Sequence, residues 1–241
     1  MSTILQEEHF KALDQIIQIF LEDIQNLFNI NENLYEKYIL NDLYKDPTTE
    51  QFIIKRQTGQ LNAMQGSGTT ANLALMHCLI KYYGFDKIVE TGVDSGFSSY
   101  MLVNSLKDVN GHLLSIDILT NPRTAEFALE RFNNYTNWKL IKGIGSVDYL
   151  KTIGRDFQLY VHDSLHTRNY MLKELEEFKK CKLDRFVLFF DDQKSENFWD
   201  FCISNGLFLK KGYKVSFNKK ENVRLYDHMG GFILYEKERG L

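Results

Sequence analysis

The stretch that decides the fold is Val89-Glu90-Thr91-Gly92-Val93-Asp94-Ser95-Gly96-Phe97-Ser98-Ser99. It joins the β-branched segment 87–91, which predicts a short strand, to a segment that reads as a helix through residue 106. Glycine at positions 92 and 96 lets the backbone turn tightly and approach a ligand with no Cβ in the way. A strand, a glycine turn and a helix in this order predict a ligand-binding loop at the carboxyl edge of a parallel sheet.

The rest of the chain repeats this alternation of strand and helix. Further strands are expected over residues 112–117, 138–142, 157–163, 185–191, 213–217 and 231–236, and helices over about 122–133, 146–152, 167–180 and 196–205. Repeated βα units favour a parallel sheet with right-handed crossovers and helices on both faces. No helix is expected between the last two strands, which indicates a hairpin and one antiparallel strand. The expected fold class is α/β, with a Rossmann-like, seven-stranded, mostly parallel sheet.

The first 60 residues differ from the rest because they read as helical throughout. Apolar side chains recur there at three- and four-residue steps, forming one stripe of Leu13, Ile16, Ile17, Phe20, Leu21, Ile24, Leu27 and Phe28. Asn31 is the expected cap of a second helix. We therefore divide the chain into an N-terminal helical extension, residues 1–60, and an α/β domain, residues 61–241. The extension could form a helical layer on the domain, a lid over a substrate or a contact in a homodimer.

Composition and charge exclude several classes of function. Of the 241 residues 44% are hydrophobic, and 29 Lys and Arg against 32 Asp and Glu give a net charge of -3. This balance offers no broad basic surface for nucleic acid or for an anionic membrane. The longest apolar run, residues 186–190, is too short to cross a bilayer, and Glu7 and Glu8 do not fit a secretory signal. We therefore expect a cytoplasmic enzyme that has neither a nucleic acid nor a membrane as its partner.

The glycine loop fits a nucleoside with a charged tail better than it fits a dinucleotide. A dinucleotide fingerprint that began at Gly92 would need glycine at the positions of Asp94 and Phe97. Glu90 would repel a pyrophosphate, but it can accept hydrogen bonds from a cationic ligand. Asp117, at the end of the next expected strand, can accept hydrogen bonds from both hydroxyls of a ribose. S-adenosylmethionine is a nucleoside with a charged, non-phosphate tail, and it is the ligand that we expect here.

These residues resemble motif I and the following acidic motif of the class I S-adenosylmethionine-dependent methyltransferases, over roughly residues 60–236. The resemblance implies that Glu90 and Gly92 lie beside the methionine part of the cofactor, Ser98 near its carboxylate and Asp117 on its ribose. The turn after the third expected strand lacks the acid that the family places against adenine, so Ser146 or a backbone group is expected there. The implied cofactor-binding set is Glu90, Gly92, Gly96, Ser98, Asp117, Ser146 and Asp163.

A second group of polar residues follows the fourth and fifth expected strands. Asp163 and His166 come after the fourth strand, and Asp191 and Asp192 come after the fifth. Neighbouring parallel strands end in one crevice, where three carboxylates would repel one another and raise each other's pKa. A hard divalent cation such as Mg²⁺ removes that repulsion. The other interpretation is that Asp163 or Asp192 only caps the helix that follows it.

This second group is similar to the metal-dependent O-methyltransferases of the branch related to macrocin O-methyltransferase and the cephalosporin hydroxylase-like proteins. Their stretch of an acid followed three residues later by histidine matches Asp163 and His166, although Leu165 replaces the middle acid. Their acid pair after strand five matches Asp191 and Asp192. The resemblance implies that the three aspartates hold Mg²⁺ or another divalent cation. It also implies that Asp163 and His166 form the catalytic pair, with His166 as general base.

The expected function is Mg²⁺-assisted transfer of a methyl group from S-adenosylmethionine to a hydroxyl of a small molecule, a sugar or a secondary metabolite. A bound cation lowers the pKa of a coordinated hydroxyl, and the imidazole of His166 can accept its proton near neutral pH. Two alternatives stay open. One is a metal-independent N- or O-methyltransferase of small molecules, and the other is a non-catalytic protein that uses the cofactor fold for interactions.

Overall fold

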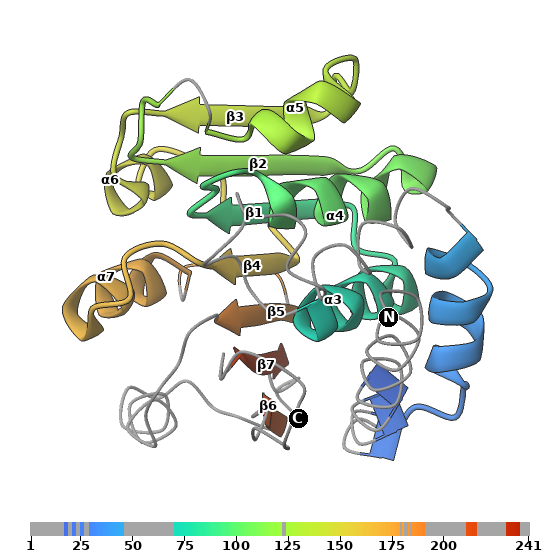
Figure 1. The fold of residues 1–241 in the computed structure, drawn as a ribbon. Coiled ribbons are helices and arrows are strands. Elements are labelled where there is room, and N and C mark those ends of the chain that lie inside the picture. The colour runs from blue at the N-terminus through green and yellow to red at the C-terminus, as the bar shows by residue number, and fades with distance from the viewer. Residues whose placement is uncertain are drawn as a thin grey trace, which may run out of the picture.

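The strands form one sheet in the computed structural model, which describes residues 17–18, 21–22, 25–26, 29–45, 70–121, 124–178, 180, 183, 185–190, 211–215 and 230–236. Among these residues the sheet has the order β3-β2-β1-β4-β5-β7-β6 (Figure 1). The strands are β1 (Lys87–Thr91), β2 (His112–Asp117), β3 (Trp138–Lys142), β4 (Leu159–His162), β5 (Arg185–Phe190), β6 (Lys211–Val215) and β7 (Gly230–Glu236). β1 to β5 pair in parallel, whereas β7 runs antiparallel to both β5 and β6.

Helices cover both faces of the sheet. They are α3 (Thr70–Tyr83), α4 (Phe97–Leu106), α5 (Glu126–Phe132), α6 (Ser146–Leu150) and α7 (Arg168–Phe178). Side chains of α3, α4 and α5 share one core cluster with Leu159 and Val161 of β4, and side chains of α6 and α7 share the other with Tyr160. Successive side chains of a strand point to opposite faces, so the two clusters lie on opposite sides of the sheet. The predicted α/β fold with its parallel strands is thereby confirmed.

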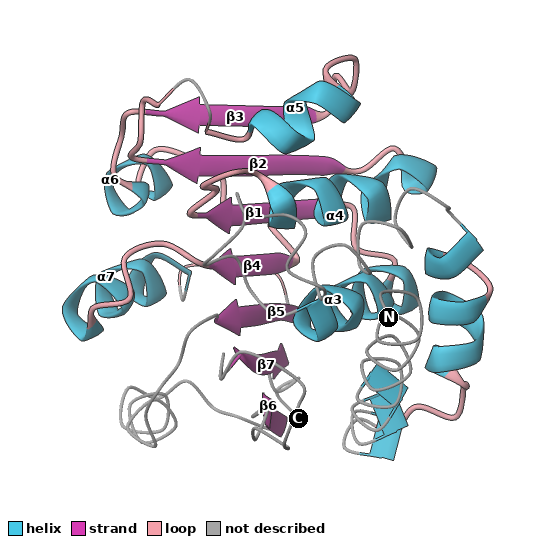
Figure 2. Ribbon diagram, viewed as in Figure 1, coloured by secondary structure: helices cyan, strands magenta, loops and turns pink. Residues whose placement is uncertain are grey.

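All five parallel strands end at the same edge of the sheet, where their arrowheads lie together in Figure 2. β1 and β2 have the bounds that the sequence predicts, and β4 is shorter than predicted, since it begins at Leu159 and ends at His162. The helix expected near residues 196–205 lies outside the described residues. Ligands of such sheets bind outside this carboxyl edge, at the point where the strand order reverses. Here that point lies between β1 and β4.

The described N-terminal residues pack on the α/β domain. Ile17 and Leu21 are fully buried and belong to the same core cluster as side chains of α3 and α4. The short helices here are η1 (Tyr35–Leu40), a π-helix, and η2 (Leu43–Lys45); a further short helix, η4 (Lys107–Val109), follows α4. The predicted cap, Asn31, is wrong, because the side chain of Asn33 accepts the hydrogen bond from the Glu36 amide at 3.0 Å. Whether residue 60 bounds a separate unit stays a prediction.

A histidine inside the fold ties this N-terminal segment to the helices. The two ring nitrogens of His77 on α3 lie 2.8 Å from the Ser105 hydroxyl on α4 and 3.1 Å from a carboxylate oxygen of Asp42. Burial lowers the pKa of His77, which favours the neutral ring. In the part of the chain that the structure describes, no helix is long and apolar enough to cross a membrane.

Candidate functional site

The glycine loop is packed so tightly that two of its positions admit no side chain. Gly92 and Gly96 adopt φ angles of +84° and +87°, in the left-handed region that disfavours a Cβ. A Cβ on Gly92 would lie 1.9 Å from the carbonyl oxygen of Asp163, and one on Gly96 would lie 2.7 Å from the Cα of Ala125. The loop is therefore packed between the segment that follows β4 and the segment that follows β2.

Asp117, the last residue of β2, holds this loop by its backbone. One carboxylate oxygen accepts the amides of Val93 and Asp94 at 2.8 and 3.0 Å, and the other accepts the amide of Leu119 at 2.7 Å. A carboxylate offers about four acceptor sites, so about one is left for a ligand in this arrangement. Asp117 is thus placed beside the loop, as predicted, but most of its hydrogen-bonding capacity serves the protein itself.

Glu90 lies inside the fold, and its carboxylate contacts three serines of the protein. Its side chain is fully buried, and its carboxylate accepts the hydroxyls of Ser98, of Ser99 at 2.5 Å and of Ser115 at 2.7 Å. Burial raises the pKa of Glu90, and the three hydroxyl donors only partly offset that increase. The prediction that Glu90 accepts hydrogen bonds from a cationic ligand does not fit this geometry, because its partners are internal. Ser98, whose hydroxyl is also engaged by Glu90, is nearly buried as well.

Asp163 and His166 lie together just after β4. The amide of Asp163 donates to the Thr91 carbonyl at 2.8 Å, which fixes its backbone against β1. His166 Nε2 lies 3.5 Å from Asp163 Oδ1, and the two side chains are 33% and 13% exposed. A partly exposed carboxylate–imidazole pair can exchange a proton with a bound molecule. Leu165, between them in sequence, is exposed to solvent.

The predicted metal site is only partly described. Asp191 and Asp192 lie outside the described residues, so the structure does not test whether they meet Asp163. Among the residues that are described, no group of three or more His, Cys, Asp and Glu side chains could hold a metal ion. The three-aspartate site therefore stays a prediction from the sequence.

The sequence analysis missed Glu174, a buried carboxylate on α7. It accepts hydrogen bonds from Thr91 at 3.0 Å, from Ser164 at 2.9 Å, from His162 Nδ1 at 2.5 Å and from the hydroxyl of Ser146. Burial raises the pKa of Glu174, but the neighbouring His162 and the hydroxyl donors outweigh it and hold that pKa below its ordinary value. His162 is fully buried.

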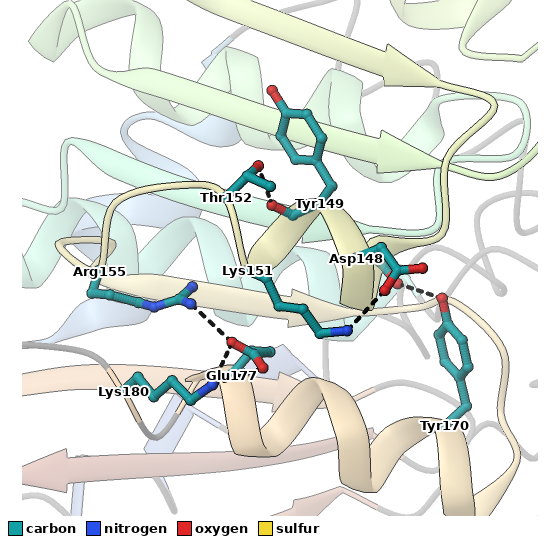
Figure 3. Close-up of polar contacts among 9 residues, drawn as sticks. Asp148, Tyr149, Lys151, Thr152, Arg155, Tyr170, Glu177 and Lys180 are labelled. Atoms are coloured by element: carbon teal, nitrogen blue, oxygen red, sulfur yellow. Dashed lines mark hydrogen bonds and ion pairs between the residues drawn. The ribbon is translucent and has the colours of Figure 1, made fainter.

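A cleft of about 560 Å³ runs between α6 and α7 beside this network. Its lining includes Ile118, which directly follows Asp117, together with Gly145 and the ring of Tyr170. The Tyr170 hydroxyl lies 2.9 Å from that of Ser146, so α7 and the first residue of α6 are joined at the cleft wall. Figure 3 shows the side chain of Tyr170 extending from α7 toward α6. Ser146 itself is buried and faces α7, whereas the sequence analysis expected it against adenine.

Part of the sequence is similar to a known protein family. Residues 89–193 match a family model described as a methyltransferase domain. This stretch is similar to a methyltransferase domain. The matched segment begins in β1, includes the glycine loop and Asp117, and extends past β5. The resemblance that the sequence analysis drew from Glu90, Gly92 and Asp117 is confirmed by this match. No curated protein matches the sequence.

Solved structures share the fold of this chain at low sequence identity. The O-methyltransferase from Bacillus cereus in complex with SAH is 15% identical, with a TM-score of 0.56 over 83% of this chain and 99% of that one. The O-methyltransferase TomG from Streptomyces achromogenes, involved in tomaymycin synthesis and solved with SAM, is 16% identical, with a TM-score of 0.57 over 83% and 98% of the two chains. The cofactor and its demethylated product are thus bound in structures of this fold.

Proposed function

We propose that this methyltransferase transfers the methyl group of S-adenosylmethionine to a hydroxyl of a small molecule. The observation that carries the proposal is the glycine loop, clasped at Gly92 and Gly96 and held by Asp117 at the carboxyl edge of the sheet. Gly92, Asp94 and Ser95 of the loop are at least partly exposed, and its sequence excludes a dinucleotide fingerprint. Both similar structures bind the same cofactor or its product.

The cofactor fits between the glycine loop and the cleft beside it. Asp117 keeps about one acceptor site for a ribose hydroxyl, and Ile118, next to it, offers an apolar surface that is 67% exposed. We assign the adenine to the end of the cleft formed by Ile118, Gly145 and Tyr170. An aliphatic and an aromatic side chain suit a flat purine ring, and backbone groups near Gly145 can replace the acid that the family uses there.

Asp163 and His166 supply the proton chemistry. Bound S-adenosylmethionine provides a methyl group on a sulfonium, which an acceptor oxygen can take once its proton is removed. His166 accepts that proton, and Asp163, 3.5 Å from its Nε2, stabilises the resulting imidazolium. The chain's main contribution is to align the acceptor with the methyl group at the rim between β1 and β4.

We extend the proposal to a divalent cation held by Asp163, Asp191 and Asp192. Oxygen ligands of this kind suit Mg²⁺, and one of the three, Asp163, lies at the rim with a partly exposed carboxylate. When bound, the cation would lower the pKa of an acceptor hydroxyl. The acceptor is then a small hydroxylated molecule, a sugar or a secondary metabolite; TomG, which shares the fold, is an O-methyltransferase involved in tomaymycin synthesis.

Calorimetry with S-adenosylmethionine and S-adenosylhomocysteine tests the core of the proposal. The wild-type protein should bind both ligands, and Asp117→Ala should weaken both, because the glycine loop loses two backbone hydrogen bonds and the turn after β2 loses one. Lys87 and Asp156 pair at the opposite edge of the sheet, so Asp156→Ala is the matched control and should bind as the wild type does. Binding of neither ligand by the wild type would eliminate the methyl-transfer function and leave the non-catalytic alternative.

A further inference from the structure

Glu174 gathers side chains from several segments around one buried carboxylate. Its Oε1 accepts the hydroxyls of Ser146 and, at 2.9 Å, of Ser164. Its Oε2 accepts the hydroxyl of Thr91 at 3.0 Å and lies 2.5 Å from Nδ1 of His162. With four donors, the carboxylate uses about all of its acceptor sites. Its side chain is fully buried, so these contacts are shielded from water.

The donors come from three segments that meet at the carboxyl edge of the sheet. Thr91 ends β1 and precedes Gly92; Ser146 begins α6 beside the cleft. His162 ends β4, and Ser164 comes two residues later, so this pair encloses Asp163. One carboxylate thus contacts the residue before Gly92, the first residue of α6 and the residues on either side of Asp163.

We propose that Glu174 is a positioning residue of the methyl-transfer site, which it serves by holding these three segments in register. The inference rests on the proposed function, because two of these segments adjoin the glycine loop and Asp163, to which that function assigns cofactor binding and catalysis. Glu174 contacts neither the cofactor nor the acceptor. It acts through Thr91, Ser146 and the residues on either side of Asp163.

Anchoring of α7 does not by itself account for a carboxylate at this position. Met171, Leu175 and Phe178 already pack the helix into the core cluster on that face of the sheet. An apolar side chain among them would stabilise the helix as well as a buried charge does or better, because burying a charge is costly. Tyr170, one turn before Glu174, also reaches Ser146 at 2.9 Å, so two side chains of α7 hold the same residue. The polar contacts of Tyr170 and Glu174 are therefore directed at the site segments.

The substitution that isolates this role is Glu174→Gln, with Glu177→Gln as its matched control on the same helix. The amide keeps the size of the side chain, but its NH₂ group faces two donors that the carboxylate had accepted. Glu177 is also a buried glutamate, and its carboxylate accepts from Arg155 and Lys180, each at 2.8 Å, and from none of the three segments (Figure 3). It lines the same cleft, but about two turns of α7 beyond Tyr170 and so away from the end that we assign to the adenine. Both variants lose a charge from α7, and only the first loses the site contacts.

Hydrogen exchange and S-adenosylhomocysteine affinity are the two measurements. Glu174→Gln should speed amide exchange together in residues 91–93, 145–148 and 162–166, and it should weaken S-adenosylhomocysteine about tenfold or more, because a displaced loop costs alignment. Glu177→Gln should leave both within about twofold of the wild type. Exchange that changes only within α7, with affinity unchanged, would overturn the inference.

A milder variant keeps the test decisive if Glu174→Gln does not fold. Thr91→Val preserves the shape of a buried side chain and removes one donor to Glu174. It should speed exchange in residues 91–93 and weaken S-adenosylhomocysteine about threefold; no change in either would contradict the role. If the wild type itself bound no S-adenosylhomocysteine, the proposed function would fail, and coupled exchange in the three segments would still decide whether Glu174 holds them together.

Discussion

The backbone of Gly92, just after β1, lies against the carbonyl oxygen of Asp163, just after β4, so closely that a Cβ on Gly92 would stand 1.9 Å from that oxygen. The amide of Asp163 in turn donates to the carbonyl of Thr91 at 2.8 Å. The cofactor loop and the proposed catalytic pair are therefore one packed unit. A change in one of them must move the other.

Gly92→Ala should lower the free energy of unfolding and S-adenosylhomocysteine affinity together. Gly84 is the control, because its φ of +66° carries the same backbone strain while its Cβ would meet nothing within 4 Å. Gly84→Ala should cost about 1 kcal/mol of stability from strain alone. Gly92→Ala adds a collision with backbone atoms and should cost about 3 kcal/mol or more. Urea unfolding measures both variants, and equal losses would contradict the close packing of Gly92.

Glu90→Gln should change how stability depends on pH. Burial raises the pKa of Glu90 above its ordinary value of 4.5, so the folded state holds this proton more tightly than the unfolded state. Stability contributed by Glu90 is therefore present below the unfolded pKa and is lost as pH rises through the folded pKa. Urea unfolding of the wild type and Glu90→Gln at a series of pH values should show the wild type losing stability relative to the variant across that interval.

A carboxyl with the opposite shift provides the control for this pH dependence. The hydrogen bond from Lys87 lowers the pKa of Asp156, so its contribution is present above the unfolded pKa and is lost as pH falls through the folded pKa. The difference between wild type and Asp156→Asn should accordingly have the reverse sign of slope. Slopes of the same sign for both residues would show that Glu90 is not the buried, raised-pKa group that its three serine partners indicate.

The strands could be predicted because each one is a short β-branched or apolar run bounded by turn residues. Lys87–Thr91 and His112–Asp117 were located to the residue for that reason. Glycine at 92 and 96 marked the loop, since a tight turn before a helix requires a residue that tolerates positive φ. The fold and the place of the site follow from such local patterns.

The partners of buried polar groups could not be predicted in the same way. Glu90 was assigned to a ligand because no sequence neighbour explains it, whereas two of its donors lie on α4 and the third, Ser115, lies on β2. Glu174 did carry a signal: it lies between Met171 and Phe178 on the buried face of α7, where an acid is out of place. An acid within an apolar helical stripe predicts a buried network, but the identity of its donors depends on the tertiary fold.

His166→Ala should lower kcat and leave S-adenosylhomocysteine affinity unchanged. The imidazole lies 3.5 Å from Asp163 at the rim, where it can take a proton from an acceptor but is not part of the glycine loop. Loss of a general base reduces rates by about a hundredfold or more. His112→Ala is the control, because His112 is an exposed histidine at the opposite end of β2. Single-turnover rates and calorimetry separate the two effects, and an unchanged rate in His166→Ala would remove His166 from the mechanism.

Removal of divalent cations should abolish turnover without preventing binding of S-adenosylhomocysteine. The ligands of the proposed cation are Asp163, Asp191 and Asp192, whereas the glycine loop is held by hydrogen bonds from its own amides to Asp117. Dialysis against a chelator should therefore lower kcat, and added Mg²⁺ should restore it. The control is Asp156→Asn, which changes a carboxylate paired with Lys87 far from this rim and should respond to the chelator and to Mg²⁺ as the wild type does.

Asp191→Asn and Asp192→Asn should each need more Mg²⁺ for half-maximal rate, because a neutral amide is a weaker ligand than a carboxylate. Full activity in the chelated protein would assign the reaction to the metal-independent mechanism, in which Asp163 serves His166 only.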